Sequence, residues 1–346
     1  MPQKIASRAF VFLTTTLAFA VALLAPSTPR ESLLILSKHD HTLAIVDPVS
    51  LKVLTKIPIG DDPHEVIASS DGKTAWVSNY GGGGAGALHT LAVVDLINQK
   101  TLAPIDLGAM RGPHGLDFAG GKVWFTAEAA KAFGSVDPAS GKVDLILGTG
   151  QNRTHMIYVA QDLSRIFTTN ITSATVSIFE KITPRMSSGP TGSQPAPEWN
   201  QTIVNVGAGA EGFDVTPEGG ELWAANSQDG TISLINIADK RVVQTLAANI
   251  RGANRLKFTP DGKLVFVSTL GGPDVAVFDA GSRKEIKRIP VGHGAAGIQM
   301  QQDGSRAFVA CTPDNYVVAI DLKSLTVTAH IDAGANPDGL AWAVQH

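Results

Sequence analysis

The sequence of 346 residues contains a single cysteine, Cys311. One cysteine excludes an internal disulfide, so the stability of the fold has to come from packing. The formal net charge is −3, and the 28 Lys and Arg residues are dispersed along the chain. A nucleic-acid groove needs a basic stripe, and we therefore expect no nucleic-acid partner. The sequence also lacks a nucleophile elbow, a phosphate loop, a dinucleotide fingerprint, an H-E-x-x-H motif and a haem-attachment motif.

Long apolar runs are absent except near the N-terminus. Lys4 and Arg8 precede the almost wholly apolar run Ala9–Ala25, which contains small residues at A-x-A-like spacing before Pro26. This order predicts a cleaved secretory signal peptide over residues 1–28. We expect a periplasmic or secreted protein with no membrane span in its mature chain. The alternative is an uncleaved membrane anchor, which the length of the run barely permits.

One pattern recurs seven times along the rest of the chain. Each copy has a Pro-x-Gly-like turn, an apolar strand, an Asp-Gly-like turn and three further short β-runs. The clearest copy opens at Pro63, turns at Asp71-Gly72 and continues with Ala75–Asn79, Thr90–Asp95 and Thr101–Leu107. Alternating or Val/Ile-rich runs of this length are typical of strands. Four-stranded units with a period of roughly 40 to 45 residues are typical of propeller blades.

The two ends of the chain complete the pattern. The segment Pro337–Ala343 is an opening strand with nothing after it, whereas Leu33–Leu36 matches a second strand. We therefore predict an all-β fold over residues 31–346. It is a seven-bladed β-propeller of four-stranded antiparallel blades, in which the C-terminal strand closes the ring by pairing with the N-terminal segment. We expect a monomer. Two insertions, Gly81–His89 and Thr183–Trp199, interrupt the period and predict loops.

Several segments resemble the YVTN-repeat propellers, a family that includes the YncE-like bacterial proteins. The resemblance rests on the Pro-x-Gly and Asp-Gly turns and on four runs: Ala75–Tyr80, Phe167–Asn170, Trp223–Asn226 and Thr231–Ile235. It covers nearly everything after residue 31. It implies the propeller fold, and it implies no single activity, because the members of the family have various functions.

The middle residue of each Pro-x-Gly-like triplet is expected at the rim of the central channel, because the loops that enter the first strands emerge at one face. Around the ring these residues are His64, His114, His155, Glu211, Asn254, Ala296 and Asp338. Imidazoles and a carboxylate bind transition metals. We predict one ion, Zn, Cu, Fe or Ni, or an acid/base site, at His64, His114, His155 and Glu211. The alternative is that each histidine hydrogen-bonds its own turn.

Other residues are predicted on the same face, as ligand contacts or as partners of the histidines. Glu128 stands where other copies have Asn at the end of the second strand, and it is a candidate general base. Three arginines flank the triplets and are candidates for an anionic ligand or for ion pairs between blades: Arg153, Arg251 and Arg255. Three further histidines belong to loops of this face: His39, His41 and His89.

These residues support two hypotheses of function. The first is an exported binding or interaction module that holds an envelope protein or a small ligand on its axial histidine-rich face. The second is a metal-dependent enzyme of lactone hydrolase, lyase or oxidase type, in which the metal polarises a substrate or activates water. Other propeller families carry lactonases, lyases and metal-dependent oxygenases at the axial site, so the fold permits this activity without selecting it.

Overall fold

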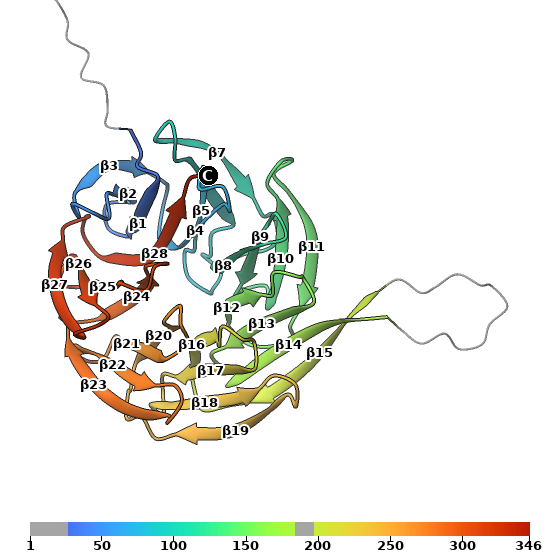
Figure 1. Cartoon of the computed structure of the whole chain (residues 1–346). Helices are drawn as coiled ribbons and strands as arrows, with labels where there is room; N and C mark the ends of the chain where they lie inside the picture. Colours follow the sequence, from blue (N-terminus) through green and yellow to red (C-terminus); the bar gives the residue numbers. More distant parts are fainter. Residues whose placement is uncertain (1–26, 184–196) are drawn as a thin grey trace, which may run out of the picture.

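The computed structural model describes residues 27–183 and 197–346, which form twenty-eight strands in seven four-stranded sheets. The sheets are arranged as blades around a central axis (Figure 1). The predicted seven-bladed propeller is therefore confirmed. The described ranges contain no helix, and hence none long and apolar enough to cross a membrane. Most of the predicted signal segment (residues 1–26) and of the second insertion (residues 184–196) lies outside the described residues.

The strands of each blade are given from the axis outward. Blade 1 comprises β28 (Pro337–Val344), β1 (Glu31–Ser37), β2 (Thr42–Val46) and β3 (Val53–Pro58). Blade 2 comprises β4 (Pro63–Ala68), β5 (Thr74–Asn79), β6 (Thr90–Asp95) and β7 (Lys100–Asp106). Blade 3 comprises β8 (Pro113–Ala119), β9 (Lys122–Ala127), β10 (Ala132–Asp137) and β11 (Lys142–Gly148). Blade 4 comprises β12 (Thr154–Val159), β13 (Arg165–Asn170), β14 (Thr175–Ile182) and β15 (Glu198–Asn205). Blade 5 comprises β16 (Ala210–Val215), β17 (Glu221–Asn226), β18 (Thr231–Asn236) and β19 (Arg241–Leu246). Blade 6 comprises β20 (Ala253–Phe258), β21 (Leu264–Thr269), β22 (Asp274–Asp279) and β23 (Lys284–Pro290). Blade 7 comprises β24 (Ala295–Met300), β25 (Arg306–Cys311), β26 (Tyr316–Asp321) and β27 (Thr326–Ile331).

Blade 1 closes the ring. Its inner strand β28 pairs antiparallel with β1, with Trp342 opposite Leu33 and Leu340 opposite Ile35. The two ends of the chain thus share one sheet, as the sequence predicted. Each inner strand also contacts the inner strands of the neighbouring blades. Pairing with β28 covers the inner edge of β1, which would otherwise be an open sheet edge.

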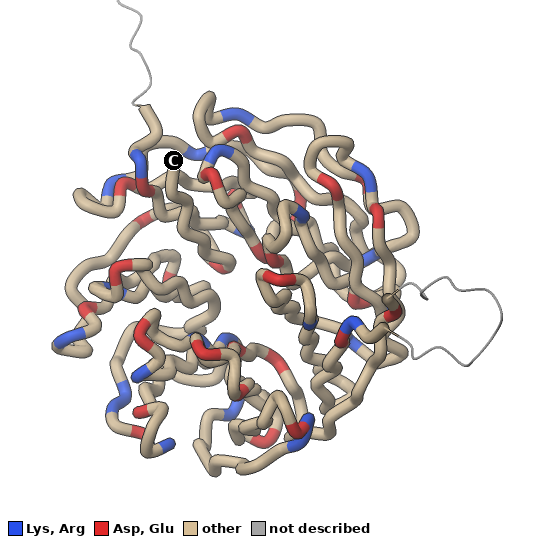
Figure 2. Tube along the Cα trace, turned by 45° about the vertical axis from the view of Figure 1, so that its right-hand side comes forward, with Lys and Arg blue, Asp and Glu red and all other residues tan. Residues whose placement is uncertain are grey.

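The hydrophobic core lies between blades. One cluster joins Leu34 and Ile45 of blade 1 to Val77 and Val94 of blade 2, all fully buried. Equivalent clusters connect the other blades around the ring. The strands therefore bury apolar side chains on both faces, because each blade is covered by its two neighbours. Lys and Arg are interspersed with Asp and Glu over the ring (Figure 2).

A β-bulge interrupts the beginning of each inner strand. In β4 the register shifts between Pro63 and Val66, so that His64 and Glu65 together oppose the single residue Ser78 of β5. Equivalent shifts occur in the inner strands of the other six blades. Bulges bend a strand and change the direction of its side chains. Here they turn the triplet residues toward the axis.

A hydroxyl group from the second strand fixes each of four bulges. The Oγ of Ser78 accepts the N–H of Glu65 at 3.0 Å and donates to the carbonyl of His114, in the next blade, at 2.9 Å. Thr126 does the same between Gly115 and the carbonyl of His155. Thr169 and Ser268 repeat the contact. These hydroxyls connect neighbouring inner strands directly beneath the predicted site.

Candidate functional site

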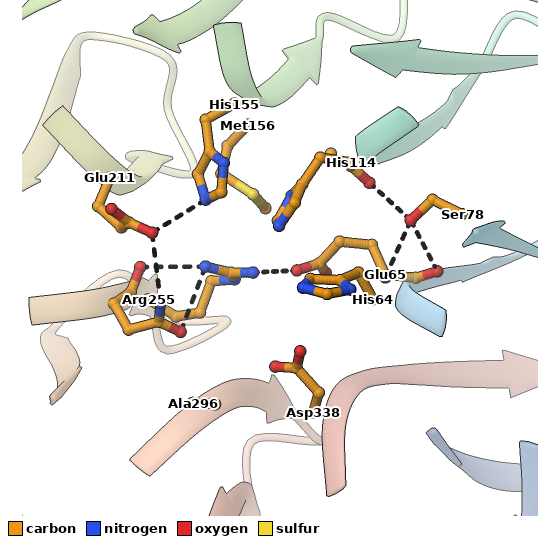
Figure 3. A network of polar contacts seen from close by, with 12 residues as sticks. His64, Glu65, Ser78, His114, His155, Met156, Glu211, Arg255, Ala296 and Asp338 are labelled. Carbon is orange, nitrogen blue, oxygen red and sulfur yellow. Dashed lines mark hydrogen bonds and ion pairs between the residues drawn. The ribbon is translucent and has the colours of Figure 1, made fainter. Parts of the chain in front are cut away.

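Three histidines meet at the mouth of the channel (Figure 3). The ring centroids of His64 and His114 are 5.0 Å apart, and those of His114 and His155 are 3.8 Å apart. Tyr80, which follows β5, completes the group at 4.6 Å from His64 and 5.0 Å from His114. We call His64, Tyr80, His114 and His155 the axial cluster. The rings come from blades 2, 3 and 4, as the spacing of the triplets predicted.

His155 lies between two carboxylates. Its Nδ1 is 2.5 Å from Oε1 of Glu128, and its Nε2 is 3.0 Å from Oε1 of Glu211 as an ion pair that is poorly aligned for a hydrogen bond. Burial opposes protonation of His155, but the charges of Glu211 and Glu128 outweigh it and raise its pKa. Burial likewise opposes ionisation of the two glutamates, yet contact with His155 lowers the pKa of each. The two carboxylates therefore favour the protonated form of His155.

Glu128 also connects the axial cluster to the rim. It accepts a hydrogen bond from the hydroxyl of Tyr80, and Nε of Arg153 lies 3.4 Å from its Oε2. Burial and this carboxylate raise the pKa of Tyr80, so its hydroxyl stays protonated and donates. Glu128 accordingly contacts His155. A general-base role for it remains a prediction.

His114 is the exception in this network. The residue is only 3% exposed, and its Nδ1 is buried without a hydrogen-bond partner among the described residues. Burial lowers its pKa well below the usual value, and the nearby charges of His155 and His64 add to the effect. His114 is therefore a neutral imidazole. A buried polar atom without a partner costs about 1–3 kcal/mol, so an orphan of this kind calls for an explanation.

His64 is held from the rim by Lys38 and Asp62. Its Nε2 lies 2.7 Å from Nζ of Lys38, and its Nδ1 lies 3.4 Å from Oδ1 of Asp62. The ammonium of Lys38 can only donate, so Nε2 of His64 is the acceptor. Lys38 also lies 3.4 Å from a carboxylate oxygen of Asp338. Lys38 directly follows β1, as Tyr80 follows β5 and Glu128 follows β9.

Arg255 and Glu65 form the floor of the site. They belong to blades 6 and 2, and their ion pair crosses the channel (Figure 3). The guanidinium also donates to the carbonyl and the Oδ1 of Asn254, both at 3.3 Å. Arg255 is 5% exposed, so it lies inside the channel rather than on the rim. Its position favours the interpretation as an ion pair between blades over contact with a ligand at the rim.

The remaining predicted residues do not join the axial cluster. Each of the three loop histidines lies against an aspartate: His39 against Asp40 at 3.3 Å, His41 against Asp61 at 3.0 Å and His89 against Asp106 at 2.9 Å. In the described part of the chain, none of the three contacts His64, His114 or His155. Arg251 is exposed in the loop before β20, beside a hollow between blades 5 and 6.

Within residues 27–183 and 197–346, no group of three or more His, Cys, Asp or Glu side chains is arranged to hold a metal ion. The four predicted ligands form pairwise contacts instead. Both nitrogens of His155 face carboxylates, and Nε2 of His64 faces Lys38. A metal ion at His64, His114, His155 and Glu211 thus remains a prediction, and it requires these contacts to be exchanged for the metal.

A model of the Cytochrome D1 heme domain family matches residues 87–301, which is more than half of the chain. The chain belongs to this family. As a member of the Cytochrome D1 heme domain family it is a β-propeller protein, and the narrower YVTN resemblance remains a prediction. No curated protein matches the sequence.

Solved structures agree on the fold. A functionally unknown protein from Desulfotomaculum acetoxidans has a TM-score of 0.73 at 14% identity, covering 91% of this chain and 99% of that one. Hydrazine synthase of Kuenenia stuttgartiensis has a TM-score of 0.64 at 16% identity, covering 81% and 89%. A candidate 6-phosphogluconolactonase from Bacteroides fragilis has a TM-score of 0.68 at 16% identity, covering 92% and 99%. At these identities the similarity shows the fold alone.

The name of the Cytochrome D1 heme domain family implies a haem, and the axial residues do not fit one. A haem iron needs a ligand such as His with open space beside it for the flat macrocycle. Among the described residues, two axial imidazoles have a nitrogen without a hydrogen-bond partner. His114 is covered by the rings of His64, Tyr80 and His155, and Nε2 of His155 faces Glu211. The cavity below Arg255 is about 260 Å³ and has no histidine in its wall. Pockets for drug-sized ligands begin at about 300 Å³, and a tetrapyrrole needs more.

Proposed function

We propose that the protein is an exported, monomeric binding module whose axial cluster takes a small molecule with an anionic group. The observation that carries this proposal is the orphaned Nδ1 of His114. A ligand, or a water that the ligand displaces, would supply the missing hydrogen bond. The imidazole is neutral, so it can accept a hydrogen bond on one nitrogen and donate one from the other.

We infer that the ligand carries an anionic group by comparing the exposed fractions of the basic and acidic side chains around the axial cluster. The side chain of Arg153 is 47% exposed, whereas that of its partner Glu128 is 0% exposed. The side chain of Lys38 is 27% exposed, against 11% for Asp338 and 37% for Asp62. Arg153 therefore lies closer to solvent than its carboxylate, whereas the exposure of Lys38 lies between those of its two partners. A carboxylate or phosphate group can approach Arg153 by bidentate contact while the rest of the molecule reaches His114.

The second candidate is the metal-dependent enzyme. It is favoured by the contact of three imidazoles with each other and of His155 with Glu211. The similarity to a candidate 6-phosphogluconolactonase permits lactone hydrolysis as one reaction class, through the fold alone. In this case His114 would bind the metal through its orphaned nitrogen. Neutral imidazole is the form that binds metals.

One experiment separates the two. Binding of citrate and of inorganic phosphate to the purified protein is measured by isothermal titration calorimetry, and its metal content by elemental analysis. We expect His114→Ala and Arg153→Gln to weaken anion binding at least about tenfold, or about 1.4 kcal/mol. His330→Ala is the matched control, because His330 is exposed on the outer strand β27.

The possible results distinguish the binding module from the metal-dependent enzyme. A stoichiometric transition metal that is lost in His114→Ala would favour the enzyme over the binding module. Anion binding that is the same in His114→Ala, Arg153→Gln and His330→Ala would refute the proposal for this site. Binding lost equally in all three variants would also refute it, because the outer histidine has no contact with the axial cluster.

A further inference from the structure

A second set of side chains faces the axis below the ion pair of Arg255 and Glu65. Each blade contributes the residue three positions after its triplet residue, and six of these line a cavity of about 260 Å³: Ile67, Asp117, Tyr158, Asp214, Lys257 and Gln299. Ala341 of blade 1 completes the ring. We call this cavity the channel chamber. Its upper end is the ion pair, so it is separated from the axial cluster.

The channel chamber leads toward the face opposite the histidines. A hollow of about 340 Å³ shares four of its wall residues, Ile67, Ala68, Gln302 and Trp342. This hollow is also lined by Ser69, Ser70, Gly120 and Gly121, in the turns that follow the inner strands of blades 2 and 3. A ligand can thus enter without passing the axial cluster.

One half of the channel chamber is polar and carries fixed carboxylates. Asp117 accepts the backbone N–H of Phe118 at 2.8 Å and that of Val159, in the next blade, at 2.6 Å. Asp214 likewise accepts from Val215 and Phe258, both at 3.0 Å. These bonds hold the carboxylates in place. Each oxygen retains a free acceptor site, because a carboxylate has about four.

The carboxylates outnumber the cations that could neutralise them. Nζ of Lys257 lies 3.9 Å from Asp214, and among the residues that the structure describes no cation contacts Asp117. Burial raises the pKa of Asp117 to about 6; the charge of Lys257 opposes this effect and that of Asp214 adds to it. Burial and then these two carboxylates also raise the pKa of Tyr158. The polar half therefore holds the carboxylates of Asp117 and Asp214 against the single nearby ammonium of Lys257 among the described residues.

The other half of the channel chamber is apolar. Ile67, Leu340, Ala341 and Trp342 of blades 1 and 2 form it. Trp342 is 8% exposed, and its Nε1–H is buried without a hydrogen-bond partner in the described residues. An indole donor usually finds a partner when it is buried. The wall of the channel chamber thus contains an orphaned donor, on a different blade from the orphaned nitrogens of His114 and His155.

We propose that the channel chamber binds a small organic ammonium ion with an apolar body. Its ammonium group lies between Asp117 and Asp214 beside Tyr158, and its apolar part packs on Ile67, Leu340 and Trp342. The charge compensates the carboxylate that lacks a cation, and aromatic rings in the wall favour cations further. The size of the cavity admits a single-ring amine and excludes large ligands.

The test is the binding of three probes of one shape by isothermal titration calorimetry at about pH 8, where an alkyl amine is protonated as lysine is. The probes are benzylamine, the neutral benzyl alcohol and the anionic benzoate. We expect benzylamine to bind at least about tenfold more tightly than benzyl alcohol. Benzoate should not bind. Equal affinity of amine and alcohol, or no binding of the amine, would overturn the proposal.

Variants of the full chain assign the site. Asp117→Asn and Asp214→Asn should weaken benzylamine at least about tenfold and leave benzyl alcohol unchanged. Lys257→Met removes the cation near Asp214, so it should strengthen benzylamine binding, and this gain cannot arise from misfolding. Asp162→Asn is the exposed matched control. His114→Ala should leave benzylamine binding intact, because the axial cluster is a different site. Loss in His114→Ala, or no change in Asp117→Asn and Lys257→Met, would refute the assignment.

Discussion

Asp117 makes the stability of the propeller depend on pH in an unusual direction. Burial raises the pKa of this carboxyl from 3.8 to about 6 in the folded protein. A raised pKa stabilises the folded state below the unfolded value, and this stabilisation is lost as the pH rises through the folded value. The stabilising contribution of Asp117 to the free energy of unfolding is therefore fully present below pH 3.8 and absent above about pH 6. The groups that face it are Tyr158, Asp214 and Lys257.

The magnitude follows from the difference between the two pKa values. They differ by about 2 units, and each unit corresponds to 1.36 kcal/mol, so the contribution is about 3 kcal/mol. Asp117→Asn removes this titration. It also weakens one of the hydrogen bonds from Phe118 or Val159, which is a cost that does not vary with pH. The stability of the variant minus that of the wild type should thus increase by about 3 kcal/mol from acid to neutral pH.

The assay is urea denaturation between about pH 4 and pH 8, followed by tryptophan fluorescence. Asp162→Asn provides a control of opposite sign, because hydrogen bonds from Ser164 lower the pKa of Asp162. Because the pKa of Asp162 lies at or below 3.8 in both states, the stability of this variant relative to the wild type should decrease slightly near pH 4 and stay constant at higher pH. A difference between Asp117→Asn and the wild type that is constant with pH would refute the reasoning. It would mean that Asp117 titrates alike in the folded and unfolded chains.

Three further predictions concern the rest of the ring. Glu128→Gln should destabilise the fold by about 3–5 kcal/mol, because it breaks a buried ion pair. It should also lower the pKa of His155 in an NMR titration, and an unchanged pKa would contradict the pairing of these two residues. Gly297→Ala should cost at least about 1–3 kcal/mol in urea denaturation, because its Cβ would lie 2.1 Å from a carbonyl oxygen of the neighbouring inner strand; Gly148→Ala, with open space around its Cβ, is the control. Burial raises the pKa of Cys311 to about 12, so mass spectrometry should find no alkylation by iodoacetamide in the native protein and full alkylation in urea.

The architecture could be predicted because its determinants recur. Seven Pro-x-Gly-like triplets count the blades, and the unmatched opening strand Pro337–Ala343 shows how the ring closes. At Gly297 the need for glycine is steric, because a Cβ atom there would overlap the backbone of the next inner strand. A residue that is needed in most blades leaves a periodic trace in the sequence.

The contacts within the axial cluster could be predicted only in part. The spacing of the triplets places His64, His114 and His155 around one mouth, and the structure confirms that their rings meet. The spacing of the triplets does not reveal which hydrogen-bond partner each imidazole ring takes. Lys38, Tyr80 and Glu128 occupy the same position, directly after the second strand, in blades 1, 2 and 3. The residue type differs from blade to blade, so the period does not identify their partners. Such contacts depend on side-chain conformations across blades, which no local pattern encodes.

The channel chamber could not be predicted from the sequence because of the bulge in each inner strand. A regular strand directs every second residue to the same face, so the residue three positions after the triplet residue would point away from the axis. The bulge inserts one residue after His114, and this shifts the alternation so that Asp117 also faces the channel. The same shift brings Asp214 to the axis in blade 5. With the bulge known, the two faces of the ring can be distinguished in the sequence itself. The triplet residues line the histidine mouth, and the residues three positions later line a chamber with different chemistry and a separate entrance.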